Sequence, residues 1–146
     1  MTIQSLLVLG LRLTGVGQLF IAGLTFWLRG VIGWKADLAK LRPFNRCIVY
    51  TYSYYIQAIN AIFGLICLLQ PRDLLGNTPL AADVTLLMAT YWIVRLILGF
   101  VYYPTDEYTK QRPLYFWGNW AFVFLFSAQI VALTGAFLWN LGALGA

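Results

Sequence analysis

Histidine is absent from this sequence of 146 residues, and its absence removes three common kinds of site. Imidazole is the commonest metal ligand, a usual axial ligand of haem and the usual general base of enzymes. We therefore expect no metal site and no histidine-based catalysis, and no other catalytic constellation stands out. No cofactor is predicted.

Cysteine is nearly absent as well, and the two thiols do not form a redox motif. Cys47 and Cys67 fall on what reads as one continuous helix, where a spacing of twenty residues corresponds to about 30 Å. A disulfide needs Cα atoms within about 7 Å, and no CxxC motif is present. We expect small buried thiols.

Charged residues are scarce as well. Only 10% of the residues are charged and 61% are hydrophobic, with a mean hydropathy of +0.75, whereas a soluble domain has about a quarter charged residues. This composition excludes a soluble globular fold. The net charge of +5 would suggest nucleic acid as a partner of a soluble protein, but here the basic residues gather between apolar runs. No nucleic-acid partner is expected.

Four segments are apolar and long enough to span a bilayer: residues 3–29, 46–69, 83–103 and 114–139. The connections between them are short, and proline and glycine punctuate the second and third. The length suggests one domain covering residues 1–146. The predicted fold class is all-α: a polytopic membrane protein with four transmembrane helices in an up-down, left-handed bundle.

Basic residues are distributed unevenly between the connections, and this predicts an orientation. The first connection holds five of them against one acid, and the third holds two: Arg29, Lys35, Lys40, Arg42 and Arg46, then Lys110 and Arg112. The positive-inside rule places both connections in the cytoplasm and both termini outside. A cleaved signal peptide would export the five basic residues and lacks an A-x-A-like site, so an uncleaved first span is favoured.

The first connection also has the pattern of an interfacial helix. Trp34, Leu38 and Leu41 are spaced at i, i+4 and i+7, which predicts a short helix lying on the membrane surface. Four basic residues outside this spacing are candidates for contacts with anionic head groups: Lys35, Lys40, Arg42 and Arg46. A plain basic loop is the alternative.

Each span has one face that is polar or small, at heptad spacing. The faces comprise Arg12, Gly15, Leu19, Ala22 and Phe26 in the first span; Arg46, Tyr50, Ser53, Gln57, Asn60, Gly64 and Cys67 in the second; Met88, Tyr91, Arg95, Gly99 and Tyr102 in the third; and Tyr115, Asn119, Phe122, Phe126, Gln129, Leu133, Ala136 and Asn140 in the fourth. We expect these faces to meet inside the bundle. Hydrogen bonds that set helix register are the simpler explanation of each amide taken singly.

Arg12 and Arg95 are the two charges that fall within spans, where an arginine costs roughly 2.5–3.5 kcal/mol. Helical side chains lean toward the helix N-terminus, which for Arg12 is the outer side. Arg12 can therefore snorkel outward or form an ion pair with Asp73 or Asp83 at that side.

Arg95 leans toward the bilayer centre instead, and no Asp or Glu lies deep in any span. Its candidate acceptors within the bundle are Tyr50, Gln57, Asn60, Tyr91, Asn119 and Gln129. An external anion, a lipid phosphate, a quinone carbonyl or a carboxylate of another subunit would also serve. Arg95 and these six residues form the candidate site for a ligand or a partner, and a purely internal network is the alternative.

Two stretches, LRPFNRCIVYTYSYYIQAINAIFGLICLL and YWIVRLILGFVYYP, resemble a group of small uncharacterised bacterial integral membrane proteins with four helices. The resemblance rests on Arg42, Pro43, Phe44 and Arg46, on Phe63 and Gly64, and on Tyr91, Trp92 and Arg95. It implies a four-helix architecture and a bacterial inner membrane, but no activity.

Three functional hypotheses follow. The favoured one is a non-catalytic subunit or assembly component of a larger inner-membrane complex, with other membrane subunits or further copies of the chain as partners. The alternative is a binding or transport module that holds an anionic, lipid or quinone-like molecule at Arg95. A small membrane enzyme comes third, because only tyrosine, cysteine or a neighbour of an arginine is present to act as an acid or base.

Overall fold

The computed structural model describes residues 2–102 and 113–144, with the side chains of 113–115 left out. Four long helices dominate it: α1 (Ile3–Val31), α3 (Pro43–Leu69), α4 (Pro79–Val101) and α6 (Pro113–Asn140). A short helix, α2 (Trp34–Ala39), follows α1, and a 3₁₀ turn, η1 (Asp73–Leu75), follows α3. The helix class and the number of long helices are as predicted.

Proline sets where three of these helices begin. Pro43, Pro79 and Pro113 are each the first helical residue, a position at which the fixed φ of proline suits the helix and its missing N–H has no partner to lose. Thr78 also caps α4, because its hydroxyl accepts a 3.1 Å hydrogen bond from the Ala81 N–H. The helices therefore start up to four residues before the predicted spans, which were bounded by hydropathy alone.

All four long helices are long and apolar enough to cross a membrane, and large apolar side chains cover much of the outer surface. Phe20, Leu65, Phe124 and Val131 are all exposed. Such a surface needs a hydrocarbon environment. The chain is a multi-pass membrane protein.

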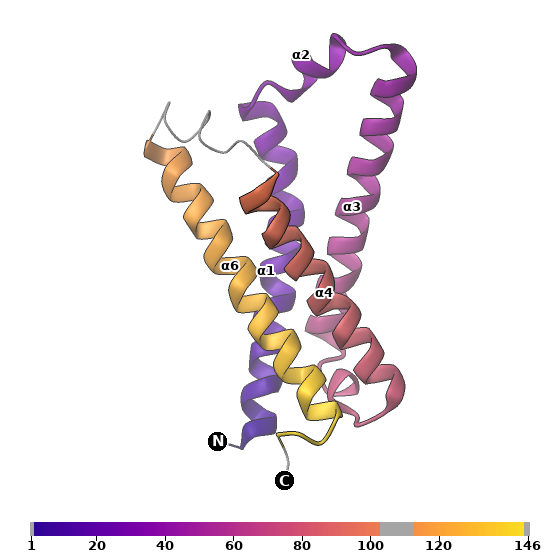
Figure 1. The fold of residues 1–146 in the computed structure, drawn as a ribbon, viewed down its shortest axis with the longest axis vertical. Coiled ribbons are helices and arrows are strands. Elements are labelled where there is room, and N and C mark those ends of the chain that lie inside the picture. The colour runs from indigo at the N-terminus through magenta and orange to yellow at the C-terminus, as the bar shows by residue number, and fades with distance from the viewer. Residues whose placement is uncertain (1, 103–112, 145–146) are drawn as a thin grey trace.

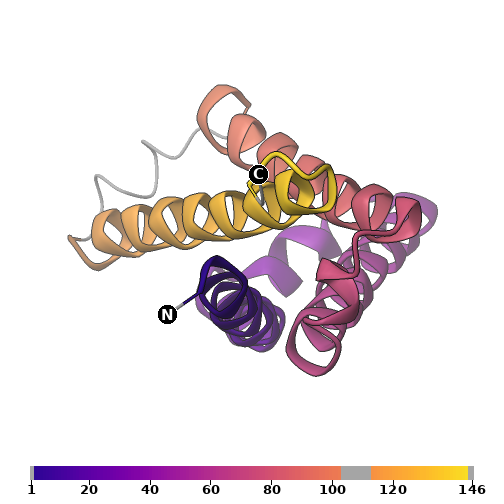
Figure 2. The ribbon, with the colours of Figure 1, turned by 90° about the horizontal axis from the view of Figure 1, so that it is seen from below.

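The four helices are arranged as two pairs, α1 with α3 and α4 with α6, and α1 also packs on α6. Both termini lie at one end of the molecule, here the termini end, and α2 lies at the other, here the α2 end (Figure 1). The two helix pairs meet toward the termini end and diverge toward the α2 end, as both views show (Figure 1, Figure 2). The bundle is therefore closed at one end and splayed at the other.

Close contact within the first pair depends on two glycines. Gly15 and Gly64 are both buried where α1 crosses α3. A Cβ on Gly15 would lie 2.7 Å from the carbonyl oxygen of Gly64 and 2.8 Å from the amide nitrogen of Leu68. Small residues let membrane helices approach this closely in the absence of a hydrophobic driving force.

The inward face of α1 is rotated from the one predicted. Gly15 and Ala22 are buried as expected, but Arg12 and Phe26 are exposed. The buried face also contains Leu11, Thr14, Gln18 and Ile21. The heptad pattern was anchored on Arg12, whereas the helix turns this cation outward, where its side chain avoids the cost of burial.

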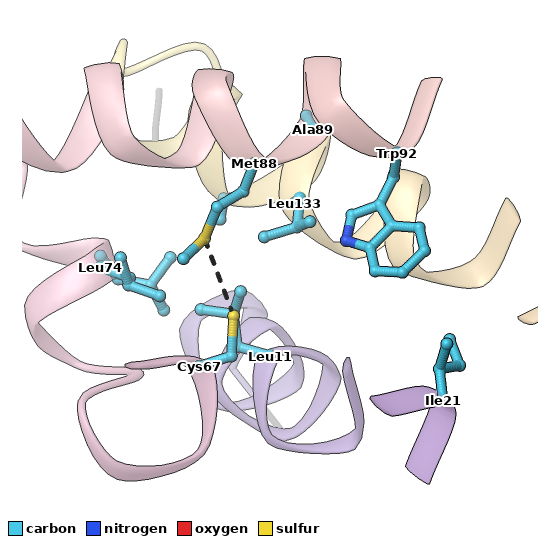
Figure 3. Close-up of a cluster of buried hydrophobic side chains, with 10 residues drawn as sticks. Leu11, Ile21, Cys67, Leu74, Met88, Ala89, Trp92 and Leu133 are labelled. Atoms are coloured by element: carbon cyan, nitrogen blue, oxygen red, sulfur yellow. Dashed lines mark hydrogen bonds between the residues drawn. The ribbon is translucent and has the colours of Figure 1, made fainter. Parts of the chain in front are cut away.

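A hydrophobic cluster closes the termini end. Leu11, Cys67, Leu74, Met88 and Leu133, which come from every part of the bundle, pack together there (Figure 3), and the Cys67 Sγ lies 4.0 Å from the Met88 Sδ. Trp92 and Ile21 continue this cluster toward the α2 end.

Side chains of α6 fasten the connection around η1 to the same end. The Asn140 amide donates a 2.8 Å hydrogen bond to the Leu74 carbonyl and accepts one of 3.0 Å from the Asn77 N–H. The Trp139 indole donates a 3.3 Å hydrogen bond to the Leu75 carbonyl. The termini end is thus closed by both apolar packing and polar contacts.

The short helix α2 appears where it was predicted, but part of its apolar face packs on the protein. Leu38 is buried, and the Trp34 ring meets the Tyr50 ring of α3 edge-on at 5.5 Å. The turn into α2 requires a left-handed residue, which Gly33 supplies with a φ of 68°.

Candidate functional site

A cavity of about 600 Å³ lies at the splayed end, and five helices line it: α1, α2, α3, α4 and α6. Its polar lining consists of Thr25, Arg29, Ser53, Arg95 and Asn119. The rest of the lining is aliphatic or aromatic, apart from one glycine. The cavity thus combines two cations with apolar walls.

Arg29 reaches the cavity from the last turn of α1. One of its terminal nitrogens donates a hydrogen bond to the Ser53 hydroxyl of α3. The centre of its guanidinium lies 4.9 Å from the Phe26 ring, 4.7 Å from the Trp34 ring and 5.3 Å from the Tyr54 ring. These cation–π contacts and the hydrogen bond fix the guanidinium between three helices.

Arg95 reaches the same cavity from α4, on the other helix pair. Its guanidinium lies 5.8 Å from the centre of the Phe126 ring of α6. Its Nε is buried and has no hydrogen-bond partner among the described residues. Arg95 is half-buried, and no carboxylate of a described residue pairs with it, a costly arrangement in a membrane span.

A polar contact between the two helix pairs lies next to Arg95, outside the cavity lining. Tyr91, one turn from Arg95 along α4, donates a 2.8 Å hydrogen bond through its hydroxyl to the Asn60 Oδ1 of α3. The same hydroxyl interacts electrostatically with the Arg95 guanidinium. Asn60, Tyr91 and Arg95 thus form one connected polar group that links the two helix pairs.

Three glutamines lie deeper in the described interior with unpaired polar atoms. Gln57 and Gln129 are buried as their spacing predicted, and neither the Gln57 Oε1 nor either polar atom of the Gln129 amide has a partner there. Gln18 of α1 is fully buried with both amide atoms unpaired. Interior amides of this kind hold water or a ligand, or exchange hydrogen bonds with each other.

Only part of this site is predictable from the sequence. Of the predicted residues, Arg95 and Asn119 line the cavity, Tyr91 and Asn60 bond to each other outside its lining, and Gln57 and Gln129 lie in the interior. Tyr50 packs on Trp34 outside the lining.

Arg29 and Gln18 were missed. Arg29 was counted with the basic connection, although α1 continues to Val31. Gln18 was missed because the face of α1 was anchored on Arg12, whereas Leu11, Gln18 and Ile21 share the buried face.

Acidic side chains stand apart from the cavity in the described part of the chain. Asp37 pairs with Lys40 at 2.8 Å, and this contact raises the pKa of the exposed Lys40 ammonium. It is the one ion pair among the described residues, so Arg12 pairs with neither Asp73 nor Asp83 within 4.0 Å. Arg12 is exposed on the surface of α1 instead.

The candidates for head-group contacts lie around the α2 end. Lys35, Lys40 and Arg42 are exposed and Arg46 is half-buried. No group of three or more cysteine and acidic side chains that would suit a metal ion occurs within residues 2–102 and 113–144.

Comparisons with protein-family models, with curated proteins and with solved structures give no match to this chain. The resemblance to a bacterial membrane-protein family therefore identifies no family. What stands is the coarser conclusion that the chain is a small membrane protein with four long apolar helices packed as a bundle.

Proposed function

We propose that this protein is a membrane-embedded binding or transport module that holds an anionic ligand in the cavity between its two helix pairs. One observation carries the proposal: Arg29 and Arg95, from different pairs, line the same cavity, and no acidic residue is among its lining in the described chain. Two cations near hydrocarbon without a counter-charge among the described residues are costly, and an anionic ligand whose oxygens reach both of them offsets that cost through charge-assisted hydrogen bonds.

The charge pattern supports an orientation for this site. The α2 end, where the cavity lies, also carries the basic residues of the connection between α1 and α3. The positive-inside rule then orients the cavity toward the cytoplasm and both termini away from it. A bacterial inner membrane is part of the same proposal.

Thermal unfolding of the purified protein in detergent, followed by tryptophan fluorescence, tests the binding. Hexyl phosphate is the anionic probe and hexanol is its uncharged control. We expect hexyl phosphate to raise the Tm, because a ligand at about 100 times its Kd adds about 2.7 kcal/mol to stability. Hexanol should leave the Tm unchanged.

Variants of three arginines make this test specific. Arg29→Gln and Arg95→Gln should each weaken the response to hexyl phosphate about tenfold in concentration, the factor that corresponds to about 1.4 kcal/mol. Arg12→Gln is the matched control, since Arg12 lies on α1 but is exposed outside the cavity. Arg95→Lys keeps the charge and should retain part of the response. An unchanged response in the Arg29→Gln/Arg95→Gln double variant, with its fold intact by size-exclusion chromatography, would overturn the proposal.

One feature of α3 favours a second candidate, the non-catalytic subunit of a larger membrane complex. Tyr55 is 64% exposed on the outer face of α3, twelve residues or about 18 Å from the start of that helix. Its hydroxyl has no hydrogen bond among the described residues, although a polar group at such depth needs one. A partner helix with an acceptor would provide it.

Native mass spectrometry of the protein released gently from its host membrane separates the two candidates. A second polypeptide at fixed stoichiometry, lost in Tyr55→Phe but retained in Tyr52→Phe, is expected for a subunit. A lone chain or a homo-oligomer that carries a small added mass is expected for a binding module.

A further inference from the structure

We infer that the ligand is an anionic phospholipid whose acyl chain lies in the cavity and which enters from the bilayer at the splayed end of the bundle. This inference rests on the binding function proposed above and adds the class of ligand and its route. It follows from the walls of the cavity, the depth of its arginines and the way its rim opens.

The walls of the cavity suit a chain rather than an inorganic ion. A volume of about 600 Å³ is typical of pockets for organic molecules, which are mostly apolar with a few polar groups that fix orientation. A lone phosphate between Arg29 and Arg95 would leave the apolar walls of the cavity, including Phe122 and Phe126, uncovered. An acyl chain covers those walls and gains van der Waals contacts with them.

The two arginines lie at different distances from the ends of their helices. Arg29 is two residues from the end of α1, or about 3 Å along the axis, whereas Arg95 is six residues from the end of α4, or about 9 Å. A phosphate at the membrane interface meets Arg29, and the ester carbonyl that follows it in a glycerophospholipid comes within reach of Arg95. The unpaired Nε of Arg95 offers a donor for that oxygen.

Apolar residues at the rim connect the cavity with the surrounding bilayer. Phe100 of α4 is 61% exposed, and Phe116 and Trp120 of α6 are 46% and 51% exposed, yet all three line the cavity. Exposed apolar side chains of this kind are unfavourable in water. In the bilayer they give an acyl chain a continuous apolar path into the cavity.

The contacts between the helix pairs show where this path opens. Close approaches of α1 to α6 occur at Gly10 and Gly17, and α3 meets α4 at the Asn60–Tyr91 hydrogen bond and at Cys67. All of these contacts lie on the termini side of the cavity. Beyond them the pairs diverge (Figure 1), and the cavity occupies this splayed end.

Photo-crosslinking in nanodiscs tests the inference. The probe is phosphatidylglycerol with a diazirine in one acyl chain, and phosphatidylcholine with the same chain is the zwitterionic control. We expect phosphatidylglycerol to label residues 21–32 and 116–126 about tenfold more than phosphatidylcholine does, the factor set by one charge-assisted contact. This excess should disappear in Arg29→Gln/Arg95→Gln and persist in Arg12→Gln. Exposed Phe20 and Leu65 should react equally with both lipids.

Competition identifies the source of the anion. Unlabelled phosphatidylglycerol should remove the cavity adducts, and glycerol 3-phosphate, which has the phosphate but no chain, should leave them. Equal labelling of the cavity by both lipids, or full competition by glycerol 3-phosphate, would overturn the lipid inference. If hexyl phosphate still raises the Tm through the two arginines, anion binding stands and only the lipid assignment fails; if that response is absent too, both fail.

Discussion

The hydroxyl of Tyr91 donates a 2.8 Å hydrogen bond to the Oδ1 of Asn60 and so links α4 to α3 just before the two helices diverge. The next turn of α4 carries Arg95, which lines the cavity. The bond therefore marks the level at which the closed half of the bundle ends and the cavity begins. At that level the Tyr91 hydroxyl connects the two helix pairs.

Removing this hydroxyl should weaken the association of the two helix pairs. Tyr91→Phe leaves Asn60 without its partner, and interhelical hydrogen bonds in membranes average about 0.6 kcal/mol and reach about 1.7 kcal/mol. We expect a loss of stability in that range when the protein is unfolded by SDS in mixed micelles. Tyr52→Phe, at an exposed position on α3, is the matched control and should be neutral.

A double-mutant cycle shows whether the loss belongs to this bond. Asn60→Leu should cost less stability in the Tyr91→Phe background than in the parent. Additive losses would mean that the two side chains contribute independently, in contradiction to the geometry.

Gly15 and Gly23, both on α1, differ in the space around them and give a second prediction. A Cβ on Gly15 would clash with the backbone of Gly64 and Leu68, whereas a Cβ on Gly23 would meet nothing within 4 Å. Gly15→Ala should therefore force α1 and α3 apart at a cost of about 1–3 kcal/mol. Gly23→Ala should be neutral or stabilise α1 by up to about 1 kcal/mol, since alanine is the better helix former.

The same SDS titration measures the stability of both variants. We expect stability to fall in Gly15→Ala and to stay unchanged or rise in Gly23→Ala. Equal effects of the two substitutions would show that Gly15 does not lie at a close helix crossing. That outcome would also question the burial of Gln18, which lies next to Gly64 across the same contact.

How far the sequence predicts this site differs from helix to helix. On α3 the heptad pattern is sufficient, because Gln57, Asn60, Gly64 and Cys67 are all buried. Polar and small residues there stand out against an otherwise apolar helix, so one face is unambiguous. On α1 the buried and exposed faces are both largely apolar, and the choice of Arg12 as an anchor shifted the predicted face.

The cavity itself is beyond what periodicity can predict. It exists because the two helix pairs diverge at the α2 end (Figure 1), and divergence is a property of tertiary packing rather than of any single helix. Arg29 belongs to the site because α1 continues through it and α2 folds back over it with Trp34. When the basic residues between spans are counted, such a residue serves only to predict the orientation of the chain in the membrane.

The hydrogen bonds of the Asn140 side chain at the termini end give a third prediction. Asn140→Leu removes the hydrogen bonds to the Leu74 carbonyl and from the Asn77 N–H. Each is worth about 0.5–1.5 kcal/mol, so amide exchange at Asn77 should accelerate up to about tenfold. Asn140→Asp keeps the acceptor for Asn77 and should leave that amide protected. Unchanged exchange in Asn140→Leu would show that the hydrophobic cluster alone closes this end.

The two cysteines offer a direct test of the proposed orientation. Cys47 is exposed near the start of α3 at the α2 end, whereas Cys67 is buried in the hydrophobic cluster. If the α2 end faces the cytoplasm, a membrane-impermeant maleimide should label Cys47 in inverted membrane vesicles and leave it unlabelled in right-side-out vesicles. Cys47→Ser should abolish labelling in both, because burial protects the Cys67 thiol. Labelling of Cys47 only in right-side-out vesicles would reverse the orientation and place the cavity on the opposite side of the membrane, while leaving the anion site itself intact.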